Sequence, residues 1–155
     1  MCIIVDASVA SDFFASPPAT PYDKVWKWID GGRGRLVLGG KLTSELSKVA
    51  KARRAIQHWS RSGRAQFISD DKVLAEEAVV EELGLSRSND RHIVALARVS
   101  CGRLLCSSDI VLCDDFKNAR LISNPRGAIY NGKPDLLRKK SHVQCRIQHQ
   151  THTRD

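Results

Sequence analysis

The sequence lacks the hydrophobic runs and cysteine patterns that mark several common classes of protein. No apolar stretch approaches the roughly 18 continuous residues of a membrane-spanning helix. Residues 1–6 carry no basic segment ahead of their apolar residues, so we expect no secretory signal. The five cysteines form no CxxC pair. Most of them lie among apolar residues and are expected to be buried thiols in a reducing cytoplasm, namely Cys2, Cys101, Cys106 and Cys113.

The chain does have an ordinary size and a clear excess of positive charge. Its 155 residues, 42% of them hydrophobic, are enough for one domain with its own core, and we find no internal repeat. The net charge of +8 favours an acidic partner such as a nucleic acid, although many basic proteins bind none. The excess is concentrated in residues 133–155 and in residues 41–64, where Glu45 is the sole acid.

Short apolar runs alternate with helical patterns along the chain. Cys2–Val5 is a continuous apolar run, which is typical of a strand buried on both faces. Further strands are expected at 35–38, 65–68, 103–106 and 120–122. Helices are expected at 8–15, from Thr20-Pro21 to about 30, at 42–63 (one helix or two in tandem), 71–83, 88–101 and 110–116. This alternation predicts an α/β fold, a single three-layer domain with a central parallel sheet flanked by helices.

Four acidic residues stand where these segments end or begin. Asp6 follows the first strand, and Asp109 follows the strand at 103–106 after two serines. Glu45 and Asp90 lie near the starts of helices. Strand ends and helix starts share one rim of a parallel sheet, so we expect these carboxylates to converge. Because converging carboxylates repel each other unless a divalent cation neutralises them, the pattern predicts a metal site.

Each acid also has a plainer interpretation. Asp6 and Asp109 could cap the helices that follow them. Glu45 and Asp90 could be favourable charges in the first turns of their helices. Taken singly, these interpretations are as good as metal binding or better. They do not explain why all four acids face one rim, so we favour the metal site.

The segments that carry these acids resemble, as an ordered set, the PIN-domain family of metal-dependent nucleases. The similarity is to its small prokaryotic, VapC-like branch. The matching segments are 3–8, 42–46, 89–97 and 104–109, in the family's order within roughly the first 125 residues. Each segment alone is a weak signal, and the ordered set is fairly specific. The resemblance implies a PIN-like nuclease domain, which we place at residues 1–132.

The resemblance also implies the roles of individual residues. It makes Asp6, Glu45, Asp90 and Asp109 both the catalytic residues and the ligands of Mg²⁺ or Mn²⁺, the ions that hard oxygen ligands select. The family usually has another acid shortly before a phenylalanine. Here Asp114 or Asp115 precedes Phe116, and Asp115 is the candidate for an outer or second-metal ligand. Ser8 and Ser107 are expected to hydrogen-bond the ligand carboxylates or bound water.

The implied activity is that of a cytoplasmic, metal-dependent endoribonuclease, a hydrolase that leaves a 5′-phosphate and a 3′-hydroxyl. No residue distinguishes RNA from DNA as the substrate. The resemblance allows the toxin of a toxin–antitoxin pair, with a small antitoxin protein as partner, and a homodimer. The alternative is a catalytically silent PIN-fold module that binds nucleic acid or a protein. The complete set of acids favours the enzyme.

The basic segments suggest how a polyanion could be held. Lys48, Lys51, Arg53 and Arg54 are predicted to contact phosphates beside Glu45, although a solvated helix face would have the same composition. Residues 133–155 are predicted to be a basic, flexible tail. The spacing of four residues in this tail superficially suggests a zinc site, namely His142, Cys145, His149 and His152. No hydrophobic framework surrounds them.

Overall fold

The apolar runs form a five-stranded parallel sheet in the computed structural model, which describes residues 2–138. The strands are β1 (Cys2–Val5), β2 (Arg35–Gly39), β3 (Ala65–Ile68), β4 (Leu104–Cys106) and β5 (Ala128–Ile129). Their order across the sheet is β3-β2-β1-β4-β5, and every neighbouring pair is parallel. The predicted fold class is therefore confirmed.

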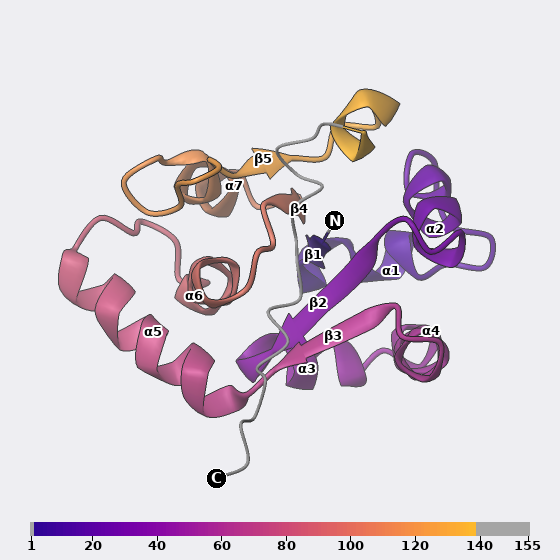
Figure 1. Ribbon diagram of the computed structural model, residues 1–155, viewed down its shortest axis with the longest axis horizontal. Coiled ribbons are helices and arrows are strands. Elements are labelled where there is room, and N and C mark those ends of the chain that lie inside the picture. Colours follow the sequence, from indigo (N-terminus) through magenta and orange to yellow (C-terminus); the bar gives the residue numbers. More distant parts are fainter. Residues whose placement is uncertain (1, 139–155) are drawn as a thin grey trace, which may run out of the picture.

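The helices connect the strands and cover the sheet. They are η1 (Ala7–Val9), α1 (Ala10–Phe13), α2 (Asp23–Asp30), α3 (Gly40–Ser47), α4 (Ala50–Arg61), α5 (Asp70–Leu83), α6 (Arg91–Val99), α7 (Ile110–Lys117) and η2 (Pro134–Leu137). Figure 1 shows α5 and α6 on one side of the strands and α2 and α4 on the other. The chain winds outward from β1 to β3 and then returns to β4 beside β1, which places a topological switch point between β1 and β4.

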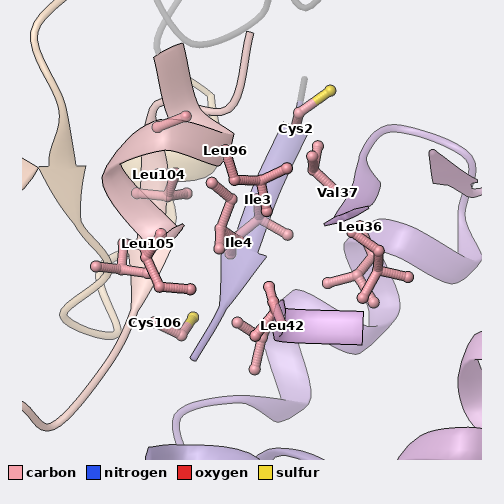
Figure 2. Packing of buried hydrophobic residues seen from close by; sticks show 14 of the residues in the cluster. Cys2, Ile3, Ile4, Leu36, Val37, Leu42, Leu96, Leu104, Leu105 and Cys106 are labelled. Carbon is pink, nitrogen blue, oxygen red and sulfur yellow. The ribbon is translucent and has the colours of Figure 1, made fainter. Parts of the chain in front are cut away.

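The core is centred on β1, whose four residues are all buried. Figure 2 shows Ile3 and Ile4 between side chains of β2 and β4. Full burial of an isoleucine stabilises a fold by about 1.5–3 kcal/mol, so this continuous apolar strand is fixed in place by both of its neighbours. The carboxyl end of β1 is consequently a rigid position, and Asp6 is the next residue.

Helix boundaries differ from the expected ones in ways that affect the site. The pattern at 42–63 is two helices, because Val49 is extended (φ −96°, ψ 112°) and separates α3 from α4. The left-handed conformation of Gly40 (φ 58°) starts α3 immediately after β2. A Cβ there would lie 2.9 Å from Val73, so α3 packs closely against α5. Helix α6 begins at Arg91 rather than at residue 88, which makes Asp90 its N-cap residue.

The expected strand at 120–122 is wrong, since the fifth strand is Ala128–Ile129. Leu121 is buried without joining the sheet, and its carbonyl accepts a hydrogen bond from Arg98 Nη1 at 2.6 Å. Arg103 similarly donates to the carbonyl of Pro125 at 2.9 Å. A cavity of about 190 Å³ lies at this place, at the opposite end of α6 from Asp90. Arginine side chains thus bind backbone carbonyls that a neighbouring strand would otherwise bind. An apolar sequence pattern cannot predict such contacts.

The ordered chain also extends beyond the boundary expected at residue 132. Residues Pro134–Leu137 form η2, and Leu137 is buried in the core. The four cysteines expected to be buried differ in exposure, since Cys2 and Cys106 are buried, Cys113 is partly buried and Cys101 is exposed. The remainder of the proposed tail, residues 139–155, lies outside the described residues, as do its histidines. Within residues 2–138, none of the helices combines the length and the apolar character needed to cross a membrane.

Candidate functional site

Asp6 lies at the switch point between β1 and β4 and is 96% buried, with 4% of its surface exposed. Its backbone N–H donates to the carbonyl of Cys106 at 2.9 Å, which extends the β1–β4 ladder by one residue. The side chain does not cap η1. Instead its Oδ2 accepts hydrogen bonds from Ser8 Oγ at 2.6 Å and from Ser107 Oγ at 2.9 Å. These contacts leave Oδ1 available, and the predicted pairing of both serines with a carboxylate is confirmed.

Asp109 stands on the neighbouring turn after β4. Its backbone N–H donates to Ser107 Oγ at 3.1 Å, so one serine joins Asp109 to Asp6. Its Oδ1 accepts the N–H of Leu112 at 3.1 Å, which makes Asp109 a true N-cap of α7. Helix capping, the plainer interpretation, therefore accounts for one of the two carboxylate oxygens of Asp109. The other oxygen, Oδ2, accepts no hydrogen bond from the described residues.

Asp90 occupies the N-cap position of α6, but its side chain makes no capping hydrogen bond. The N–H of Asp90 itself donates to Ser88 Oγ at 3.0 Å, in the turn that precedes the helix. Its carboxylate is therefore free for another purpose. The structure gives Asp90 the role of an acid held at a helix start rather than that of a helix cap.

Glu45 lies in the second turn of α3 and faces His92 of α6. The atoms Glu45 Oε1 and His92 Nε2 are 2.7 Å apart. Neither atom has a hydrogen-bond partner of good geometry in residues 2–138. At 2.7 Å a nitrogen and an oxygen repel unless a proton lies between them, so the two side chains form a close polar pair that shares one proton. His92 is 3% exposed and was not singled out by the sequence, which shows only a histidine in the first turn of a buried helix.

The four acids share one electrostatic environment. Burial raises the pKa of Asp90 above its ordinary value. The carboxylates of Asp6, Glu45 and Asp109 raise the pKa of Asp90 further, while His92 lowers it. Each carboxylate therefore acts on Asp90 through space, as expected if the acids converge on one rim.

The acids nevertheless do not form a complete ligand set as they stand. Among residues 2–138, no three His, Cys, Asp or Glu side chains are grouped so as to hold a metal ion. Their present contacts explain this, since Asp109 caps α7 and Glu45 faces His92. Direct binding of one ion by several of these acids would require at least one of them to leave its present partner.

Asp115 is placed differently from the other acids. It lies on α7, is 2% exposed, and accepts hydrogen bonds from Ser86 Oγ and from the backbone N–H groups of Arg87 and Ser88. Its oxygens are thus occupied by the loop that precedes α6. We leave Asp115 out of the candidate metal site.

The basic residues proposed to contact phosphate are all exposed. Lys48 follows α3, and Lys51, Arg53 and Arg54 lie on α4. Arg53 has an additional structural contact, because its Nη1 donates to the carbonyl of Ser47 at 3.0 Å near the end of α3. The most independent cations of this surface are therefore Lys51 and Arg54, which belong to the helix that follows the one carrying Glu45.

Asp90→Asn is expected to raise the melting temperature of the metal-free protein at pH 7 to 8. The folded-state pKa of Asp90 is raised above its ordinary value of 3.8, so the neutral form favours folding. The stability that neutral Asp90 contributes is fully present below the pKa it has in the unfolded chain. It is lost as the pH rises through the higher pKa it has in the folded protein. The stabilisation by Asp90→Asn should therefore shrink as the pH falls toward 4. Thermal melts in a chelator across this range measure it, and a lower melting temperature at pH 7 would contradict the repulsion.

Two comparisons with known proteins identify no relative of this chain. Neither a scan against protein-family models nor a search of curated proteins finds a match to the chain.

Proposed function

We propose that the protein is an Mg²⁺- or Mn²⁺-dependent endoribonuclease that acts at the rim formed by Asp6, Glu45, Asp90 and Asp109. The observation that carries the proposal is the convergence of these acids, since Ser107 joins Asp6 to Asp109, while burial and the other three carboxylates raise the pKa of Asp90. An arrangement that costs stability without a cation is expected where a cation or a reaction requires it.

The available oxygens fit a hard divalent cation. Asp6 presents Oδ1, Asp109 presents Oδ2, and the carboxylate of Asp90 is not used for capping. Glu45 Oε1 faces His92 Nε2 at 2.7 Å and would have to exchange this partner for the ion. Carboxylate oxygens are the ligands that Mg²⁺ and Mn²⁺ prefer, so these acids would hold the ion. A bound ion of this kind lowers the pKa of water and neutralises charge that develops on a phosphate.

The remaining residues support this chemistry by position. Ser8 and Ser107 fix one oxygen of Asp6, which sets the direction of the other. Lys51 and Arg54 supply positive charge on a neighbouring exposed surface, where a phosphate backbone would approach. Three parts of the proposal rest on the resemblance alone. They are RNA as the substrate, products that carry a 5′-phosphate, and a role as the toxin of a toxin–antitoxin pair.

Cleavage should depend completely on added divalent metal. The full-length protein is incubated with single-stranded RNA and with DNA of the same sequence, in Mg²⁺, in Mn²⁺ and in excess chelator. We expect RNA cleavage in either metal and none in chelator, because carboxylates alone cannot offset the charge of a phosphoryl transition state. Cleavage in chelator would refute the mechanism, and cleavage of DNA alone would change the proposed substrate.

The second candidate is a catalytically silent module that binds nucleic acid. It is favoured by the absence of a ready ligand group among residues 2–138 and by the capping role of Asp109. The same incubation separates the two functions when binding is measured beside cleavage. Salt-dependent RNA binding without cleavage in either metal would select the silent module.

A further inference from the structure

We infer that Asp115 is a positioning residue that holds the loop at residues 84–90 in the shape that presents Asp90 to the candidate site. This inference rests on the proposed function for its catalytic meaning. The loop connects α5 to α6, and Asp90 is its last residue. Asp115 comes from α7, which follows in the chain after β4.

The carboxylate of Asp115 is surrounded by donors from one short stretch of this loop. Ser86 Oγ donates to Oδ2 at 2.8 Å, and the N–H of Ser88 donates to Oδ2 at 2.9 Å. The N–H of Arg87 lies 3.1 Å from Oδ1 and 3.0 Å from Oδ2. No salt bridge within residues 2–138 involves Asp115. A carboxylate buried in this way is compensated by the loop backbone itself, so the loop and the carboxylate hold each other.

The loop passes this restraint on to Asp90. Ser88 is 4% exposed, and while its N–H donates to Asp115 its Oγ accepts the N–H of Asp90 at 3.0 Å. The carbonyl of Asp90 in turn accepts the N–H of Ile93 at 3.0 Å, which starts α6. Both backbone groups of Asp90 are therefore fixed, one by the loop and one by the helix. Its carboxylate is left unrestrained by capping and directed by its backbone.

The other end of α7 is tied to Asp6. Asp109 caps α7 through the N–H of Leu112, and the N–H of Asp109 donates to Ser107 Oγ, which donates to Asp6. Helix α7 thus connects the turn that holds Asp6 with the loop that holds Asp90. A change at Asp115 should move Asp90 relative to Asp6 without removing either acid.

This arrangement argues against Asp115 as a ligand. Its Oδ2 already accepts from Ser86, Arg87 and Ser88, and the residue is buried. A cation could use this carboxylate only by displacing donors that would then be buried without partners. The acid before Phe116 therefore positions a proposed ligand rather than being one.

The test compares Asp115→Asn with the matched neighbour Asp114→Asn in the full-length protein. Asp114 is exposed, and its Oδ1 lies 3.9 Å from Lys117 Nζ. Its replacement should therefore leave amide exchange, Mn²⁺ affinity and cleavage unchanged. An asparagine amide at 115 cannot accept from all the loop donors. We expect amide hydrogen exchange at Arg87, Ser88 and Asp90 to become at least about tenfold faster than in the Asp114→Asn protein. Mn²⁺ affinity, measured by titration without RNA, and cleavage at saturating RNA should each fall about 10- to 100-fold, with the KM for RNA unchanged.

The outcomes separate this inference from the proposed function. Unchanged amide exchange at these residues would overturn it, as would faster exchange with wild-type Mn²⁺ affinity and cleavage. If Asp115→Asn does not fold, Ser86→Ala removes a single donor and should shift the same quantities in the same direction by smaller factors. Failure of the wild-type protein to bind Mn²⁺ or to cleave RNA would refute the proposed function, and the positioning role with it. The exchange data would then still decide whether Asp115 holds the loop at residues 84–90.

Discussion

Asp6→Asn is expected to slow metal-dependent RNA cleavage by at least about 100-fold while leaving the domain folded. Asparagine keeps one carbonyl oxygen that can accept from Ser8 and Ser107, so the local hydrogen bonds survive. It removes the negative charge that we propose to face the cation. Single-turnover cleavage rates at saturating RNA measure the loss, and circular dichroism checks the fold.

Asp12→Asn is the control for this substitution. Asp12 is an exposed acid on α1, a few residues after Asp6, and it is not among the charges that shift the pKa of Asp90. Its replacement changes the net charge by the same amount and should leave the rate within about twofold. Equal rates for Asp6→Asn and the wild type would exclude Asp6 from catalysis and would favour the silent binding module.

Gly127→Ala is expected to destabilise the fold by about 3 kcal/mol or more, with a melting temperature lower by about 10 °C. Gly127 immediately precedes β5, and a Cβ at this position would lie 2.1 Å from the carbonyl oxygen of Phe116. That oxygen belongs to the backbone of α7, so no flexible side chain can move aside. Either β5 leaves the sheet or α7 shifts. Chemical denaturation of the two proteins measures the difference.

Gly63→Ala is the matched control, because a Cβ there meets no atom within 4 Å. Its positive φ of 74° alone should cost about 1 kcal/mol. A similar loss of stability in both variants would mean that the close approach at Gly127 relaxes easily. A loss of stability clearly larger in Gly127→Ala than in Gly63→Ala would show that β5 and α7 are tightly packed.

The fold could be predicted from the sequence largely because β1 and α6 have unambiguous patterns. Cys2–Val5 is apolar without interruption, and residues 92–97 are buried in succession. Such segments have few alternatives to the centre of a parallel α/β sheet. The positions of Asp6 and Asp90 follow from these two elements. The placement of these two acids at a strand end and a helix start was therefore accessible from the order of segments.

The parts that the sequence could not supply depend on contacts between distant residues. Nothing near residue 115 indicates that its carboxylate receives the loop at 86–88, since the partners are 27 to 29 residues apart. The approach of His92 to Glu45 depends likewise on how α3 and α6 pack. Leu121 and Ile122 were taken for a strand because burial in a turn and burial in a sheet give the same apolar pattern. Side-chain partners decide such cases, and periodicity does not record them.

The central place of β1 in the sheet has a consequence for the order in which the protein can become active during synthesis. β1 pairs with β2 and with β4, and Ser107 reaches Asp6 across 101 positions of the chain. While a nascent chain lacks residues 104–109, one edge of β1 has no strand to pair with, and Asp6 has Ser8 but not Ser107 as a hydrogen-bond donor. Such long-range closure is a slow step in folding. A ribosome making this protein would therefore carry a chain without the completed rim until most of the domain has emerged.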